Sequence, residues 1–276
     1  MSVKPTVLVT GSSTGIGAVY ADRFARRGHN LVLVARDSTR MSALASRLRS
    51  ETGVSVDVVR DLTVPQDLAE VEQRVREDAS IGILINNAGT AIPGSFVGQT
   101  GDDISRLIAL NVSAVARLAN AAAPRMAAAS EGAIVNLASV VGLAPEFGAT
   151  VYGATKAFVL FLSQGLSMEL GPKGVYVQAV LPAATRAEIW DHTGVDINTL
   201  TGVMEVGKLV DAALAGFDSR ESVTIPPLPD AAQWAAFDAA RLAMVPNFAQ
   251  SEPAKRYQPA AGSAENSTKP ADWPRN

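Results

Sequence analysis

Cysteine is absent from this chain of 276 residues, and histidine occurs only twice. Without cysteine, the protein has no disulfide framework and no thiolate chemistry. Only His29 and His192 could supply an imidazole, which excludes a histidine-rich metal site. We therefore expect no bound metal.

An excess of charge of one sign is also missing, since 24 Lys and Arg nearly balance 27 Asp and Glu and leave a net charge of −3. This balance does not point to nucleic acid or an anionic membrane as a partner. Gly, Pro and Asn interrupt the uncharged stretches, so none is expected to cross a membrane. The first strand-like run begins close to the N-terminus, which leaves no room for a signal peptide. A soluble, cytoplasmic protein is expected.

Strand-like apolar runs alternate with helix-like segments along most of the chain. The runs lie at 6–10, 31–35, 55–60, 83–86, 133–137, 176–181 and 222–225. The helix-like segments lie at 15–27, 38–52, 65–78, 101–129 and 151–171, with shorter ones near 187–192 and 204–217. Continuously apolar runs are typical of a parallel sheet that is buried on both faces. The pattern predicts a doubly wound α/β domain, with a Rossmann-like parallel sheet flanked by helices.

The C-terminal part of the chain differs in composition. A last helix is expected from Asp230 to Met244, apolar on nearly every side, and it should pack on the core or on another subunit. Residues 246–276 are rich in Pro, Ala, Ser and polar groups. We therefore predict a catalytic domain over 1–245 and a tail over 246–276.

A glycine-rich segment, Thr10 to Gly17, follows the first strand-like run and opens the first helix-like segment. Glycines let the backbone turn sharply and approach a pyrophosphate, whose charge is stabilised by free N–H groups at the helix N-terminus. The strand and helix on either side favour this interpretation over a tight loop without a ligand. The residues expected to hold a cofactor here are Gly11, Ser13, Thr14, Gly15, Ile16 and Gly17.

A second group of polar residues has the chemistry of a catalytic site. Tyr152 and Lys156 are one helical turn apart, on the same helix face. Ser139 lies just beyond one strand-like run, and the segment Asn86–Gly89 follows another. Ligands bind at the C-terminal ends of the strands in an open α/β sheet, so these elements should converge on one crevice. Asn111 lies inside the expected helix 101–129.

In this order and spacing, the motifs resemble those of the short-chain dehydrogenase/reductase family in its single-domain form. The matching positions are Thr10–Gly17, Asp61-Leu62, Asn86–Gly89, Asn111, Ser139 and Tyr152-x-x-x-Lys156. The resemblance implies hydride transfer between C4 of a nicotinamide and a carbonyl or alcohol carbon. It also implies cofactor contacts from Asp61, Leu62, Asn87, Ala88, Gly89, Tyr152 and Lys156. A turn residue without a ligand is the alternative for Asp61.

The resemblance also implies a role for each catalytic residue. Tyr152 would be the general acid in reduction, Ser139 would hold the substrate oxygen, and Lys156 would bond the nicotinamide ribose. A Lys156 ammonium about 4 Å from the phenol would contribute on the order of 4 kcal/mol, or roughly 3 pKa units, and so bring Tyr152 near neutrality. Asn111 would support a water-linked proton path to Lys156. The alternative for Asn111 is a local bond to its own helix backbone.

The cofactor is predicted from Arg36, which ends the second strand-like run. A guanidinium cannot accept a hydrogen bond from a ribose 2′-OH, but its planar fork suits a 2′-phosphate, so NADP is favoured over NAD. Arg40, one turn further on, could assist. The alternative is that Arg36 is a surface residue and Asp37 bonds the 2′-OH. After the sixth strand, the family has a Pro-Gly pair and then a Thr; here Pro182 is kept, Ala183 replaces the Gly and Ala187 replaces the Thr, which predicts weaker cofactor binding that Thr185 could partly offset.

The substrate is expected to be a hydrophobic ketone, aldehyde or secondary alcohol. The residues expected over the nicotinamide are Ile92, Phe96, Val141, Leu143, Phe147 and Trp190. The nearby Glu146, Glu188, Asp191 and His192 are interpreted as solvated loop residues, with a substrate contact as the alternative for His192.

Two other functions stay open, an NAD-dependent alcohol dehydrogenase and a non-catalytic dinucleotide sensor. Sensors of this type tend to lose the Tyr or the Lys, and this chain has both. Helix 151–171 is more apolar than one face against a sheet requires. In the family that the chain resembles, this helix and the one at 101–129 commonly pack against the same helices of a second subunit related by two-fold symmetry. The apolar surface and the resemblance together predict a homodimer or homotetramer.

Overall fold

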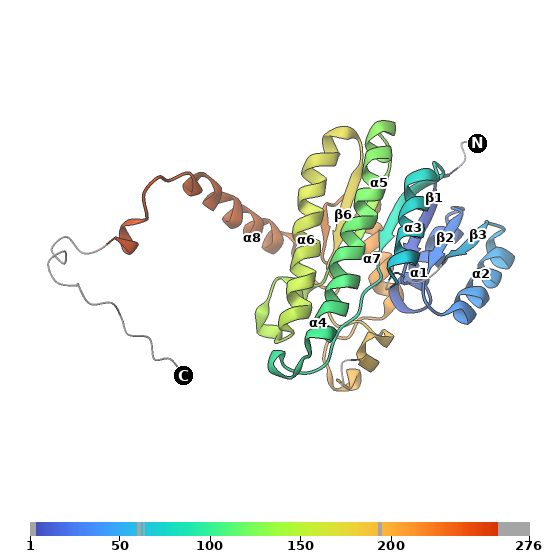
Figure 1. Ribbon diagram of the computed structural model, residues 1–276, viewed down its shortest axis with the longest axis horizontal. Coiled ribbons are helices and arrows are strands. Elements are labelled where there is room, and N and C mark those ends of the chain that lie inside the picture. Colours follow the sequence, from blue (N-terminus) through green and yellow to red (C-terminus); the bar gives the residue numbers. More distant parts are fainter. Residues whose placement is uncertain (1–3, 60–61, 63, 193–194, 259–276) are drawn as a thin grey trace. The chain divides into compact units, whose positions relative to one another are not determined.

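The computed structural model describes residues 4–59, 62, 64–192 and 195–258. The chain divides into two compact units, Met1–Pro227 and Leu228–Asn276. The first unit contains a parallel sheet with helices on both faces (Figure 1). This confirms the predicted fold class.

The sheet has seven strands in the order β3-β2-β1-β4-β5-β6-β7, all of them parallel. Their bounds are β1 Thr6–Thr10, β2 Leu31–Val34, β3 Val56–Val59, β4 Ile81–Asn86, β5 Ala133–Leu137, β6 Tyr176–Val180 and β7 Val223–Thr224. The strand order reverses between β1 and β4. The C-terminal ends of these two strands therefore border the switch-point crevice where ligands bind in such sheets.

Two hydrophobic cores lie on the two faces of the sheet. Helices α1 (Gly15–Arg26), α2 (Ser38–Thr52) and α7 (Val206–Asp218) bury Phe24, Met41 and Leu209 in one of them. Helices α3 (Pro65–Glu77), α5 (Val115–Ala129) and α6 (Thr150–Leu170) bury residues such as Leu68 and Leu118 in the other. The continuously apolar strands supply side chains to both cores, which explains why they lack a polar face.

The segment expected as one helix over 101–129 is interrupted. It consists of α4 (Gly101–Ile108), a π-helical segment η2 (Ala109–Ala114) and α5. A π-helical turn is wider than an α-turn, and such turns are frequent at functional sites. The whole stretch is long and apolar enough to cross a membrane by length and composition, contrary to our expectation, but 50% of its most apolar window is buried inside the fold. It has the position of a core helix.

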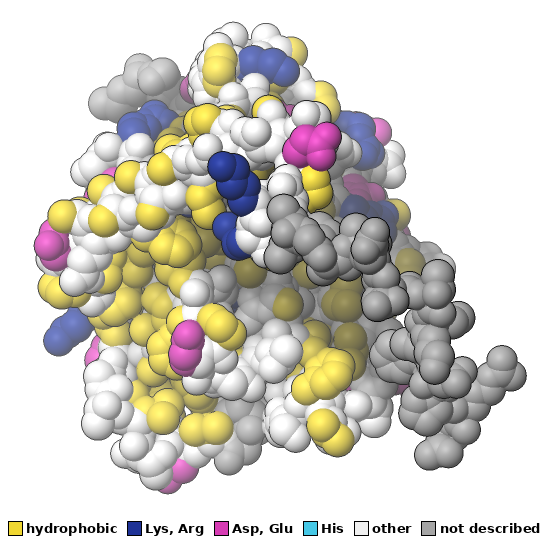
Figure 2. Space-filling view, turned by 90° about the vertical axis from the view of Figure 1, so that its left-hand side faces the viewer, with side chains coloured by type: hydrophobic (Ala, Val, Ile, Leu, Met, Phe, Trp, Pro, Cys, Tyr) yellow, Lys and Arg dark blue, Asp and Glu magenta, His cyan; other side chains and the backbone are white. Residues whose placement is uncertain are grey.

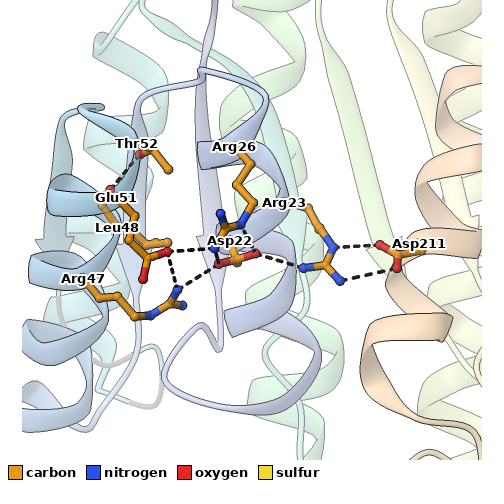
Figure 3. Close-up of polar contacts among 8 residues, drawn as sticks. All are labelled: Asp22, Arg23, Arg26, Arg47, Leu48, Glu51, Thr52 and Asp211. Carbon is orange, nitrogen blue, oxygen red and sulfur yellow. Dashed lines mark hydrogen bonds and ion pairs between the residues drawn. The ribbon is translucent and has the colours of Figure 1, made fainter.

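Asp22 on α1 lies at the centre of an ion-pair network that links α1 to two other helices of the first unit (Figure 3). Its carboxylate, 11% exposed, accepts hydrogen bonds from Arg26, Arg47 and Arg23. Arg47 lies on α2, and Arg23 also bonds Asp211 on α7. This network fixes α1, the helix that follows the glycine-rich segment, against both of its neighbours.

The second unit contains α8 (Ala231–Met244), whose N-cap is the Asp230 side chain. The sequence analysis placed this helix in the catalytic domain over 1–245, whereas the structure assigns it to the unit that begins at Leu228. The boundary at 245 and the packing partner of this helix stay predictions.

Candidate active site

A cleft of about 1180 Å³ opens at the C-terminal ends of β1, β4, β5 and β6. This volume exceeds the roughly 300–1,000 Å³ of an ordinary small-molecule site, so it has room for an extended ligand together with a second one. Most of the predicted site residues line it: Gly11, Ser13, Thr14, Gly15, Ile16, Arg36, Leu62, Asn87, Ala88, Gly89, Ser139, Tyr152, Lys156 and Thr185. Asp61 lies outside the described residues.

The glycine-rich segment is shaped by close backbone packing. Gly11 has a φ of +65°, and a Cβ on it would lie 2.8 Å from the Cα of Ala88. The Asn87 side chain donates to the carbonyl oxygens of Thr10 and Gly11, at 2.9 and 3.1 Å. These contacts hold the segment against the end of β4 and leave the start of α1 facing the cleft.

Gly17 packs against the glycine-rich segment itself. It does not line the cleft, and a Cβ on it would lie 2.3 Å from the carbonyl oxygen of Gly11. Its missing side chain therefore lets α1 approach the glycine-rich segment, and a direct cofactor contact of Gly17 stays a prediction.

Ser139 and Tyr152 both line the cleft, and their side chains lie close enough to hydrogen-bond with each other. The Ser139 hydroxyl donates to the carbonyl oxygen of Pro182 at 3.2 Å and accepts from the backbone N–H of Val141 at 3.2 Å. Burial raises the pKa of Tyr152 to about 12, although a hydrogen bond with Ser139 lowers it in part. The phenol is therefore protonated at neutral pH, as a general acid must be.

Lys156 is 6% exposed, and its ammonium donates to the carbonyl oxygen of Leu137 at 2.8 Å. Its Nζ lies 5.7 Å from the centre of the Tyr152 ring. Burial lowers the pKa of Lys156 to about 8. Our estimate that Lys156 brings the pKa of Tyr152 near neutrality is wrong for this structure, because it omitted the desolvation that burial imposes on both groups.

Asn111 lies on the π-helical segment η2 and is buried. Its side-chain oxygen accepts from the backbone N–H of Thr90 at 2.9 Å, and its amide donates to the Thr90 carbonyl at 2.9 Å and to the Thr155 hydroxyl at 3.2 Å. It does not bond its own helix, so the local alternative is wrong. Thr90 and Thr155 were missed by the sequence analysis, since neither has a spacing that identifies it.

Gly89 separates Asn111 from Lys156. A Cβ on Gly89 would lie 3.3 Å from the Asn111 side-chain oxygen and 3.4 Å from the Lys156 ammonium. The two groups therefore border the same small space. This placement agrees with the expected connection between Asn111 and Lys156.

The opposite end of the cleft carries two arginines, Arg36 and Arg40, together with two carboxylates, Asp37 and Glu188. Arg36 is exposed and lines the cleft, and no ion pair among the described parts of the chain involves it. Asp37 instead caps α2, accepting from the backbone N–H of Arg40 at 2.9 Å, and also pairs with the Arg40 side chain at 3.3 Å. Its carboxylate is engaged with Arg40 in both contacts, which weakens the alternative in which it bonds a ribose 2′-OH.

The segment after β6 forms one wall of the cleft. Ala183 and Ala187 line it, and the Thr185 hydroxyl donates to the carbonyl oxygen of Ala183 at 2.9 Å. The Trp190 indole donates to the carbonyl oxygen of Thr185 at 2.7 Å. Thr185 lines the cleft with its hydroxyl bonded within its own segment, and its compensation for the lost Thr stays a prediction.

The wall over the catalytic residues is largely apolar. Ile92, Val141, Phe147 and Trp190 line it as expected. Phe96, which is 57% exposed, and Leu143 do not line it, so these two expectations are wrong. The apolar lining residues that the sequence analysis did not single out include Pro93, Val140, Ile189, Val195 and Leu200.

The acidic residues near this wall have different surroundings. Glu188 is not a purely solvated residue, because it lines the cleft and pairs with Arg40. Glu146 is exposed, as expected. The side chains of Asp191 and His192 lie outside the described residues.

The residues of the cleft fit a phosphorylated dinucleotide. The backbone turn at Gly11 admits no Cβ, so the chain can approach a pyrophosphate closely at this point. Thr14, the N-cap of α1, makes no side-chain cap bond, which leaves N–H groups of the first turn available to an anion. Arg36 lies on the same cleft, where a 2′-phosphate would need a cation.

Comparison with known proteins agrees with this geometry. A short-chain dehydrogenase from Sphingobium yanoikuyae, solved in complex with NADPH, is 65% identical, covers 92% of this chain and 100% of its own, and superimposes with a TM-score of 0.91. A bulky-bulky ketone specific alcohol dehydrogenase from Comamonas testosteroni is 60% identical, covers 94% of this chain and 100% of its own, and has a TM-score of 0.88.

Curated relatives are more distant. The very-long-chain 3-oxoacyl-CoA reductase of Mus musculus is 34% identical over 182 residues, which is 63% of this chain and 57% of the relative. The chain thus spans less than two thirds of the length of this relative. The sequence model of the short-chain dehydrogenases matches residues 5–197, which include the glycine-rich segment and all four proposed catalytic residues. The protein belongs to the short-chain dehydrogenase family.

Proposed function

We propose that the protein is an NADPH-dependent reductase of ketones that carry two bulky, apolar substituents. The observation that carries this proposal is the position of Ser139, Tyr152 and Lys156 in a large cleft whose wall over them is apolar. The ketone specificity of the Comamonas testosteroni relative and the NADPH bound to the Sphingobium yanoikuyae relative support it.

The catalytic residues act on the ketone oxygen. Bound NADPH supplies the hydride that reaches the carbonyl carbon. The Ser139 hydroxyl turns from the carbonyl of Pro182 to donate to the ketone oxygen, and Tyr152 transfers its proton to that oxygen as the carbonyl π bond breaks. The product is the secondary alcohol, and Tyr152 is left as a phenolate.

Lys156 and Asn111 restore the site. The ammonium of Lys156 stabilises the phenolate by its charge, and a proton returns to Tyr152 through Lys156. Asn111 stays fixed by its hydrogen bonds to the Thr90 backbone. Its side-chain oxygen and the Lys156 ammonium border the same space beside Gly89, and this space is the route by which protons reach Lys156. Because the pKa of Lys156 is about 8, this residue exchanges protons readily near neutral pH.

The substrate class is tested with a series of aryl ketones whose second substituent grows from methyl to phenyl. We expect kcat/KM with NADPH to rise or hold along the series, since the apolar wall gains contact with each added carbon. A steep fall of kcat/KM beyond the methyl ketone would contradict a site built for two bulky groups.

An assembly of two or four copies also remains our proposal. Helix α6 exposes Phe158, Phe161 and Met168, which follow one another along a single helix face. Figure 2 shows that hydrophobic side chains are exposed on the face turned toward the viewer. A patch of this kind favours a closed homodimer or homotetramer. The cytoplasmic location stays a prediction.

A further inference from the structure

An ion pair between Arg40 and Glu188 joins two walls of the cleft. The Arg40 guanidinium donates to both carboxylate oxygens of Glu188, at 2.7 and 2.9 Å, and both side chains are 52% exposed. Arg40 lies on α2, at the end of the cleft that Arg36 lines, and Glu188 lies after β6, on the wall that also carries Ala187. The two residues are 148 positions apart in the chain.

The segment around Glu188 reaches the glycine-rich loop. A Cβ on Gly15 would lie 3.5 Å from the Cβ of Ala187. The base of the segment is tied by two backbone bonds of 2.9 Å, from Arg186 to Met204 and from Met204 to Ala184. The carboxylate of Glu188 is therefore held near the part of the cleft where the cofactor phosphates would bind.

The charges at this end of the cleft are nearly balanced. Arg40 pairs with Asp37 as well as with Glu188, so two carboxylates surround its guanidinium. Arg36, by contrast, appears in no ion pair of the described residues. Two cations and two anions thus lie where one additional anion, a 2′-phosphate, is expected.

We propose that Glu188 competes with the 2′-phosphate of NADP for Arg40 and so limits how strongly the protein prefers NADPH over NADH. The inference rests on the proposed NADPH dependence. Arg40 uses its Nε toward Asp37 and its Nη1 toward Glu188, so a 2′-phosphate that draws on the same guanidinium weakens the contact that holds the segment around Glu188 to α2. Binding of NADPH, and not of NADH, is thereby coupled to opening of this wall.

The test is the variant Glu188→Gln, which keeps the size of the side chain and removes its charge. Dissociation constants for NADPH, NADH and 2′,5′-ADP are measured by calorimetry at low salt. An exposed ion pair changes an equilibrium by about two- to fivefold. We therefore expect NADPH and 2′,5′-ADP to bind two- to fivefold more tightly and NADH to bind unchanged.

A matched control is Glu205→Gln. Glu205 pairs with Arg186 at 3.0 Å on the same segment and is similarly exposed, but it does not line the cleft. This variant should leave all three constants unchanged. In the Arg40→Gln background, Glu188→Gln should no longer tighten NADPH, because the competition acts through Arg40.

Three results would overturn the inference. The first is an unchanged Kd of NADPH in Glu188→Gln, and the second is an equal tightening of NADH, which would mean that the segment merely closes the cleft. The third is a gain that persists without Arg40, which would mean direct repulsion of the phosphate. Failure of the unmodified protein to bind NADPH would instead refute the proposed function.

Discussion

Replacement of Arg36 by Asp should invert the cofactor preference. The Arg36 guanidinium is exposed on the cleft, belongs to no ion pair of the described residues, and is therefore available to a 2′-phosphate. A hydrogen bond to a charged group contributes about 1.5–3 kcal/mol. This corresponds to a preference for NADPH over NADH of roughly tenfold to a hundredfold. In the variant, the contact is lost and a carboxylate repels the phosphate but can accept from a ribose 2′-OH.

The assay compares kcat/KM for NADPH and NADH with one bulky ketone, before and after the substitution. Arg36→Gln is the control, because it removes the charge without adding a carboxylate, and it should abolish the preference without inverting it. Ala183 and Ala187 lie on another wall and should affect both cofactors alike. Equal kcat/KM values in the unmodified protein, or an unaltered ratio in Arg36→Asp, would show that Arg36 is only a surface residue.

Three further predictions concern pH, stability and assembly. Because the pKa of Lys156 is lowered to about 8, its ammonium loses a proton as pH rises through that value. The rate of ketone reduction should then fall about tenfold per pH unit above pH 8, which a pH profile of the rate checks. The Lys156→Arg variant stays charged, so its pH profile should lack this inflection. Burial by itself raises the pKa of Asp22, but hydrogen bonds from Arg26, Arg47 and Arg23 lower this pKa overall. The charged carboxylate therefore stabilises the folded protein fully above the pKa of about 3.9 that Asp has in the unfolded chain, and this stabilisation is lost as pH falls through the lower pKa of the folded protein. In urea titrations, Asp22→Asn should then lower the free energy of unfolding by about 1–3 kcal/mol at pH 7 and by less near pH 3. The control Asp211→Asn, which breaks an exposed ion pair, should lower it by under about 1 kcal/mol. Equal losses in the two variants would contradict the role of burial. Light scattering should show a dimer or tetramer that Phe161→Asp dissociates, with the exposed Phe248→Asp as control, and a monomer at micromolar concentrations would refute the assembly.

The strands and most helices could be predicted from the sequence because each follows from a local pattern. A run such as Leu31–Val34 is apolar throughout and has to be buried on both faces. The glycine-rich segment and the Tyr152–Lys156 spacing are equally local, and they identified the cleft correctly. The helix at 101–129 was predicted as continuous because a π-helical turn changes the hydrogen-bond register without a distinctive composition.

The features that were missed depend on contacts between distant parts of the chain. The pairing of Arg40 with Glu188 joins residues that no sequence spacing relates. The lowered pKa of Lys156 and the raised pKa of Tyr152 arise from burial. A sequence motif gives residue types and spacing, but it does not say how deeply the side chains are buried. Asn111 was found through its family position, but its fixation by the Thr90 backbone became visible only in the fold.

The central claim is that Tyr152 donates the proton in NADPH-dependent ketone reduction. The most direct test is the single-turnover rate of hydride transfer from NADPH to a bulky ketone in Tyr152→Phe, with the Kd of NADPH measured in parallel. Removal of a positioned general acid costs about 10²–10⁴-fold in rate, and since the phenol hydroxyl is not expected to hold the fold, the Kd of NADPH should change little. A folded variant that binds NADPH and reduces the ketone at nearly the normal rate would contradict the account.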